Sequence, residues 1–254
     1  MTTVATARRV EHVMGMPISL ALRGRHTDDA AARDAWAQAV ETLRDVDRVF
    51  STYRPDSVVS RLGRGELDLA DCPPEVAEVL ALGEAARVQS HGAFDVRRGG
   101  VLDPSGVVKG WAVERAAVAL RRLSETDFSL GAGGDLVCHV AGPDSPPWRV
   151  GIEDPHDPTR VVAVVPVRGG AVATSGLAHR GGHVVDARTG AVPASVASVT
   201  VVHDDLTWAD LDATAAFALD HEAAAWLTAR GRVGLVVRAD GRRELVGPAA
   251  TPHD

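Results

Sequence analysis

The sequence has 254 residues and is poor in cysteine, with Cys72 and Cys138 its only two. The two cysteines stand far apart and show no CxxC spacing. The sequence therefore indicates neither a zinc site built from cysteines nor a disulfide framework, and it is compatible with a reducing compartment.

Long hydrophobic runs are also absent. No segment approaches the roughly 20 apolar residues of a membrane-spanning helix. Residues 1–17 contain no apolar stretch of signal-peptide length before their charges. We therefore expect a cytoplasmic protein without a membrane anchor.

Basic runs are missing as well, and the formal net charge is −7. A nucleic-acid-binding domain normally presents a basic face, so nucleic acid is not an expected partner. What remains is an ordinary globular composition, 45% hydrophobic and 24% charged. The length allows ample core for a large domain.

The order of predicted elements favours an α+β fold with a largely antiparallel sheet and packed helices. Residues 10–23 resemble a strand or hairpin arm, and short strands are expected between 126 and 203, including one at 182–187. A DG turn predicts a closing hairpin over 232–247. We expect one compact domain over residues 1–248 and a flexible tail at 249–254. Helices are expected from a start at 27–29 to about Phe50, from 73–75 to Gly92, from near Lys109 to 123, and at 208–219 and 221–230.

Asp210 and Thr214 form the most informative pair. An acid and a hydroxyl four residues apart on a helix can point at one spot. Hard cations such as Mg²⁺ prefer oxygen ligands of this kind. Taken alone, the pair is also explained by a solvated acid and a packing threonine.

Three other polar, glycine-flanked segments accompany this helix: DPSGVVKGW, LGAGGDL and ATSGLAHRGGHVVDARTG. LGAGGDL lacks the third spaced glycine of a dinucleotide fingerprint, and taken alone it is better explained by a tight strand turn. Lys109 is expected at a helix N-terminus, where a positive charge is unfavourable unless an anion such as phosphate is its partner. A solvated lysine remains an alternative.

His183 is a candidate proton acceptor, because an imidazole titrates near neutral pH. A structural histidine explains it as well, and the sequence contains nine other histidines. The segments together favour a Mg²⁺-dependent enzyme that acts on a phosphate-bearing ligand.

The ordered motifs resemble those of one family, the ApbE-like FAD:protein FMN transferases. The resemblance runs along nearly the whole chain. It rests on MGMPISL, FSTYRPDSVVSRL, HGAFDV, LDPSGVVKGWAVERAA, GAGGDL, WRVGIEDP, AVATSG, HVVDARTG and ADLDAT.

The resemblance implies Mg²⁺-dependent transfer of FMN from FAD to a Thr or Ser hydroxyl of a target flavoprotein, with release of AMP. It implies that Asp210, Thr214 and the backbone carbonyl of Gly106 bind Mg²⁺, and that His183 is the base. The residues that it places against FAD are Met14, Tyr53, Ala93, Phe94, Asp95, Asp103, Lys109 and Val184.

The sequence departs from the family pattern in a few places. Ala187 stands where proline is usual, Glu114 replaces an aspartate, and Met16 replaces a threonine. Only a short bridge joins Val96 to Val107, where most members have a long insertion. Two alternatives therefore stay open, a Mg²⁺-dependent hydrolase that splits FAD into FMN and AMP, and a protein that binds FAD without turnover.

Overall fold

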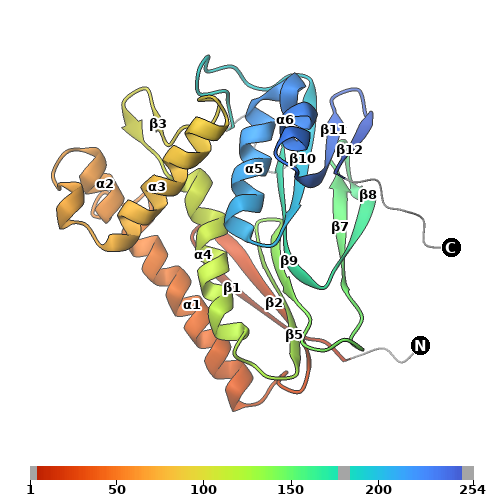
Figure 1. The fold of residues 1–254 in the computed structure, drawn as a ribbon. Helices are drawn as coiled ribbons and strands as arrows, with labels where there is room; N and C mark the ends of the chain where they lie inside the picture. The colour runs from red at the N-terminus through yellow and green to blue at the C-terminus, as the bar shows by residue number, and fades with distance from the viewer. Residues whose placement is uncertain (1–4, 177–183, 248–254) are drawn as a thin grey trace.

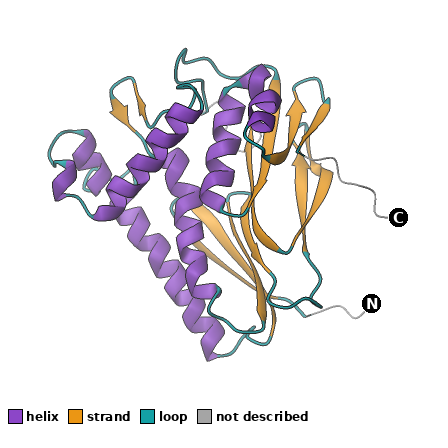
Figure 2. Ribbon diagram, in the orientation of Figure 1, coloured by secondary structure: helices purple, strands orange, loops and turns teal. Residues whose placement is uncertain are grey.

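The fold is built on one antiparallel sheet (Figures 1 and 2). The computed structural model describes residues 5–176 and 184–247. Eight strands pair in the order β1-β2-β5-β6-β9-β10-β11-β12, and every pairing is antiparallel. These strands are β1 (Ala7–Val13), β2 (Met16–Gly24), β5 (Thr126–Ala132), β6 (Asp135–His139), β9 (Gly169–Gly176), β10 (Val196–His203), β11 (Val233–Arg238) and β12 (Arg243–Val246). The predicted α+β class is confirmed.

Helices gather on one face of this sheet, with α4 between α1 and α5 (Figure 1). Two hairpins stand apart from the main sheet, β3–β4 and β7–β8. The helices are α1 (Ala30–Phe50), α2 (Val58–Gly63), α3 (Pro74–Gln89), α4 (Ser105–Leu120), α5 (Leu206–Ala218) and α6 (Ala223–Ala229), with short 3-10 turns η1 (Leu69–Asp71) and η2 (Asp220–Glu222). The hairpin strands are β3 (Arg97–Arg98), β4 (Val101–Leu102), β7 (Trp148–Asp154) and β8 (Asp157–Val167).

The alternation of side chains in the central strands explains the two layers. In β9, Ala171 and Ala173 join the large core under the helices. Val172 points the other way and packs with Val150 and Val167 of the β7–β8 hairpin. Because successive strand residues face opposite sides, one strand serves both layers. The large core extends from Val13 near the start of the chain to Val246 near its end.

Local signals place the first helix as the sequence predicts. Asp29 is its N-cap, and its side-chain oxygen accepts a hydrogen bond from the Ala32 amide at 2.9 Å. The helix ends at Phe50. The β1–β2 hairpin and the β11–β12 hairpin also lie where the sequence predicts them.

Two expectations about the elements are wrong, and helix α2 was not predicted. Helix α4 begins at Ser105 rather than near Lys109, so Lys109 lies one turn inside the helix. The part of 182–187 that the structure describes contains no strand. Instead, Asp186 accepts a hydrogen bond from the Arg188 amide and closes a tight turn.

Among the residues that the structure describes, no helix has the length and apolar character needed to cross a bilayer.

Candidate active site

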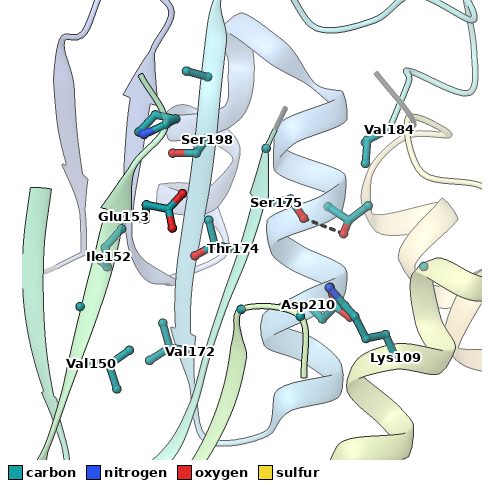
Figure 3. Close-up of a pocket in the computed structure, with 18 of the residues that line it drawn as sticks. Lys109, Val150, Ile152, Glu153, Val172, Thr174, Ser175, Val184, Ser198 and Asp210 are labelled. Atoms are coloured by element: carbon teal, nitrogen blue, oxygen red, sulfur yellow. Dashed lines mark hydrogen bonds and ion pairs between the residues drawn. The ribbon is translucent and has the colours of Figure 1, made fainter. Parts of the chain in front are cut away.

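Asp210 and Thr214 line one cavity of about 250 Å³, as their spacing on the helix predicts. Asp210 is only 2% exposed. The cavity lies between α4, α5, the ends of β9 and β10, and the β7–β8 hairpin (Figure 3). Two oxygen-bearing side chains from one helix therefore face a space that a small molecule can enter.

Lys109 forms the charged centre of this cavity. Its Nζ lies 2.5 Å from Oδ2 of Asp135 and 3.3 Å from Oδ1 of Asp210. Asp135 is fully buried, and the lysine side chain keeps 19% of its surface exposed toward the cavity. The helix-terminus explanation for a ligand at Lys109 is wrong, because α4 starts earlier, but the cation does line a ligand-sized space.

Burial and charge act in opposite directions on these groups. Burial raises the pKa of Asp210 to about 7, the positive charge of Lys109 opposes the rise, and the negative charge of Asp135 adds to it. Burial tends to lower the pKa of Lys109, but the carboxylates of Asp210 and Asp135 outweigh it and raise that pKa. The lysine therefore stays protonated at any physiological pH.

Gly110 allows α4 and α5 to approach this closely. Its amide donates to Oδ2 of Asp210 at 3.0 Å. A Cβ at this position would lie 2.7 Å from the carbonyl oxygen of Leu206 and 2.9 Å from Cβ of Asp210. This glycine therefore serves the contact between two helices, rather than the approach of backbone to a ligand.

Strand β9 extends beyond its pairing with β6 where it lines the cavity. Strand β6 pairs with β9 as far as Val172, whereas β10 accompanies β9 to Gly176. Beyond the last pair of the β6–β9 ladder, the Thr174 amide donates to Oδ1 of Asp135 at 2.9 Å. The Asp135 carboxylate therefore accepts a hydrogen bond from the part of β9 that β6 does not pair with, and it also pairs with Lys109.

A second cavity of about 620 Å³ adjoins the first. Both are lined by Ser105, Gly106, Val184 and Thr214. The residues predicted to contact FAD that line the second cavity are Ala93, Phe94, Asp95 and Asp103, besides Val184. The two predicted Mg²⁺ ligands Gly106 and Thr214 therefore lie where the cavities meet.

Two predicted site residues lie elsewhere, and a third is outside the described residues. Met14 occupies the β1–β2 turn with φ of 57° and packs on the core. Tyr53 is 96% exposed. Within the described part of the chain, neither lines either cavity. His183 lies outside the described residues, so its role remains a prediction, as do the roles of Met14 and Tyr53.

The residues that depart from the family pattern make specific contacts in the structure. Oε2 of Glu114 accepts a hydrogen bond from the Leu206 amide at 2.9 Å, so this longer acid on α4 caps the start of α5. Ala187 donates its amide to the Ala93 carbonyl at 3.0 Å. The short bridge forms the β3–β4 hairpin, in which Arg98, Gly99 and Val101 line the second cavity.

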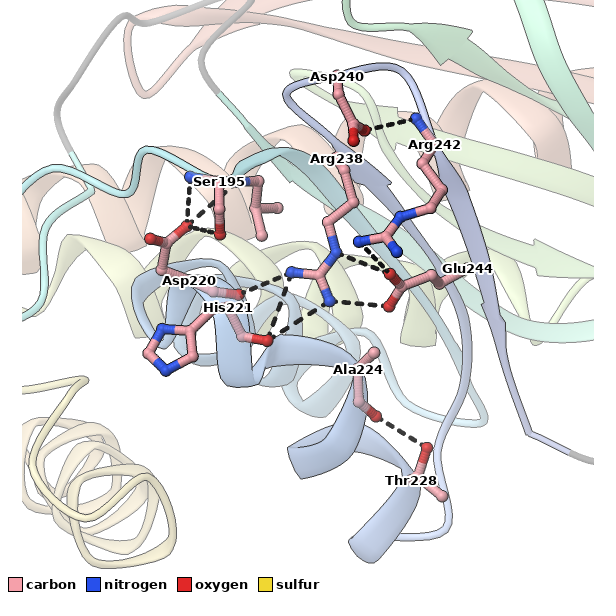
Figure 4. Close-up of polar contacts among 10 residues, drawn as sticks. Ser195, Asp220, His221, Ala224, Thr228, Arg238, Asp240, Arg242 and Glu244 are labelled. Atoms are coloured by element: carbon pink, nitrogen blue, oxygen red, sulfur yellow. Dashed lines mark hydrogen bonds and ion pairs between the residues drawn. The ribbon is translucent and has the colours of Figure 1, made fainter.

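Asp220 anchors the chain at Ser195 and Val196, just after the segment 184–190, of which several residues line the second cavity (Figure 4). Its Oδ1 accepts hydrogen bonds from the amide and the hydroxyl of Ser195, at 2.8 and 2.7 Å, and from the Val196 amide at 3.1 Å. Burial opposes ionisation, but these hydrogen bonds hold the pKa of Asp220 below its usual value. Arg238 completes the cluster by pairing with Glu244 at 2.8 Å.

The sequence analysis missed two residues of this site, Asp135 and Ser175. Ser175 lines the smaller cavity and hydrogen-bonds Thr214. Both belong to segments, GGDL and ATSG, that stand out as glycine-flanked and as family motifs, but no role was predicted for the acid or the hydroxyl. The sequence also marks Lys109 in a second way, because it is the only lysine among 27 lysine and arginine residues.

Solved structures of ApbE proteins share this fold. The ApbE protein of Thermotoga maritima superposes with a TM-score of 0.83 at 21% identity, over 95% of this chain and 97% of that one. The flavin transferase ApbE from Vibrio cholerae gives a TM-score of 0.80 at 20% identity, over 96% and 97% of the two chains.

The sequence profile of the ApbE family matches residues 14–103 and 96–237, so the chain belongs to the ApbE family. The two matched stretches overlap over residues 96–103, which include the β3–β4 hairpin. The FAD:protein FMN transferase of Rhodobacter capsulatus is 34% identical over 172 residues, which span 64% of this chain and 30% of that protein. The Klebsiella pneumoniae FAD:protein FMN transferase is 30% identical over 242 residues, 69% of this chain and 68% of that one.

Proposed function

We propose that this chain is a Mg²⁺-dependent FAD:protein FMN transferase that attaches FMN to a Thr or Ser hydroxyl of a target flavoprotein. One observation carries the proposal. Two cavities meet at Gly106 and Thr214, beside the cation of Lys109. FAD has a ring system at each end and a pyrophosphate in the middle, and this shape fits two cavities with a polar junction. The names of the relatives point to the same reaction.

The residues at the junction fit Mg²⁺. Asp210 supplies a carboxylate, Thr214 a hydroxyl and Gly106 a backbone carbonyl, and hard cations prefer oxygen donors of these kinds. The described residues contain no group of three or more His, Cys, Asp or Glu that could hold a metal by itself. Mg²⁺ commonly takes one or two carboxylates together with substrate phosphates and water, so the ligand set is completed only when FAD is present.

The proposed reaction breaks the pyrophosphate bond of FAD. The acceptor oxygen forms a bond to the phosphorus of the FMN half, the bond from that phosphorus to the AMP phosphate breaks, and the acceptor proton leaves. When bound, Mg²⁺ would neutralise phosphate oxygens and the charge that develops on AMP. Lys109 would offset the remaining negative charge. The resemblance assigns removal of the acceptor proton to His183, since an alcohol needs a base to react.

Mass spectrometry of candidate flavoproteins co-expressed with the parent chain tests this proposal. We expect an added FMN mass on one Ser or Thr residue. The matched control is His183→Ala, which should still bind FAD but should lose transfer by roughly 10²–10⁴-fold. FMN and AMP released without any labelled acceptor would indicate the hydrolase instead. FAD binding without either product would indicate a binding protein.

A further inference from the structure

Ser175 touches the proposed metal ligand directly. Its Oγ lies 2.9 Å from Oγ1 of Thr214, across the contact between β9 and α5 (Figure 3). Ser175 is 8% exposed and lines the smaller cavity. No role for Ser175 follows from the proposed reaction, because the acceptor hydroxyl belongs to the target protein.

The small residues of β9 create this contact. Ala171, Ala173 and Ser175 alternate along the strand, and the two alanines are fully buried in the core under the helices. Side chains of this size let α5 pack close to the strand. The hydroxyl of Ser175 therefore reaches Thr214 without any intervening side chain.

A threonine in a helix has two accessible χ1 positions, because its hydroxyl can also bond a carbonyl of the preceding turn. A hydroxyl that binds a cation must point a lone pair at the metal, so its proton must go to another acceptor. Ser175 offers such an acceptor at the right distance.

We propose that Ser175 is a positioning residue that accepts the Thr214 proton, selects the χ1 position of Thr214 and thereby directs its free lone pair at Mg²⁺. This inference rests on the proposed function. Partners that orient a metal ligand commonly contribute about 10- to 100-fold to metal affinity.

The sheet provides a matched control. Thr174 and Thr200 form a second hydroxyl pair between β9 and β10, with the same separation of 2.9 Å. Thr200 is 1% exposed and does not line either cavity within the described residues. Thr200→Val removes a hydroxyl pair of equal length without touching Thr214.

The test measures Mn²⁺ affinity by electron paramagnetic resonance in the presence of FAD, for the parent chain and its variants. Ser175→Ala should weaken Mn²⁺ binding by about 10- to 100-fold, whereas Thr200→Val should bind as the parent does. Ser175→Cys, which keeps a side chain with only a weak acceptor, should behave like Ser175→Ala. In a Thr214→Val background, Ser175→Ala should cause no further loss.

Parental Mn²⁺ affinity in folded Ser175→Ala, or an additional loss in the Thr214→Val background, would overturn the inference while leaving the proposed function intact. Failure of the parent chain to bind Mn²⁺ with FAD would instead contradict the metal dependence in the proposed function. Thermal melting of each variant establishes that the compared proteins are folded.

Discussion

Nζ of Lys109 lies 3.3 Å from Oδ1 of Asp210, so a cation on α4 and an anion on α5 neutralise each other at the wall of a cavity. Oδ2 of Asp135, at the start of β6, lies 2.5 Å from the same ammonium group. The ammonium group therefore has two carboxylate partners from different elements. The arrangement keeps a charged lysine beside the proposed pyrophosphate site.

Amine labelling should report the state of Lys109, because the chain has no other lysine. The two carboxylates raise its pKa despite burial, and only the unprotonated amine reacts. At pH 9 we expect an amine-reactive reagent to modify the N-terminus and to leave Lys109 largely unmodified, as measured by peptide mass spectrometry. Asp135→Asn should increase modification of Lys109. Equal labelling of Lys109 and the N-terminus in the parent chain would contradict the buried ion pair.

Asp210→Asn should change how stability depends on pH. Burial raises the pKa of Asp210 to about 7, above the value of about 3.9 in an unfolded chain. The folded parent therefore binds more protons than the unfolded chain between these values, and this group lowers the free energy of unfolding as pH rises. The asparagine variant lacks this effect.

The stability of Asp210→Asn relative to the parent should increase from pH 4 to pH 7, by more than about 1 kcal/mol in total, and then level off. Urea unfolding in the presence of EDTA measures the difference at each pH. A difference that stays constant across this range, or that decreases, would show that the pKa of Asp210 is not raised.

Gly110→Ala should destabilise the fold. Alanine favours a helix over glycine by about 1 kcal/mol, but the new Cβ would lie 2.7 Å from a backbone carbonyl oxygen of α5. Overpacking of this kind costs about 1–3 kcal/mol, because backbone must move. Urea unfolding should show a net loss. Gly142→Ala is the control, since its Cβ would meet nothing within 4 Å. A Gly110→Ala protein as stable as the parent would contradict the close contact of α4 and α5.

Asp220→Asn should lower stability near neutral pH, where the carboxylate accepts three hydrogen bonds. Hydrogen bonds to a charged group contribute about 1.5–3 kcal/mol. The pKa of Asp220 is lowered in the fold, so this contribution is present above the unfolded pKa and disappears as pH falls through the folded pKa. Unfolding measurements should therefore show a gap at pH 7 that closes in acid. The exposed Asp144→Asn should show no such gap.

Local sequence determined where several elements begin and end. Asp29 caps α1 because its side chain bonds an amide three residues ahead. The spacing of Asp210 and Thr214 placed both on one cavity, because the helical period is a property of the backbone. The start of α4 was misjudged because Gly106 is a poor helix former, yet the helix includes it, since Val107 and Val108 donate their amides to the Pro104 carbonyl.

The charged centre of the site was decided only by the tertiary structure. Lys109, Asp135 and Asp210 come from three elements that are distant in the chain, and no periodicity relates them. Pairing of Asp135 with Lys109 depends on where β6 stops pairing with β9, and the approach of Asp210 depends on the packing of Gly110 against α5. The sequence by itself determined the family motifs, the helix that carries the acid and the hydroxyl, and the antiparallel class. Packing determined which side chains neutralise one another, because burial and distance control the strength of a charge interaction and neither can be read from local sequence.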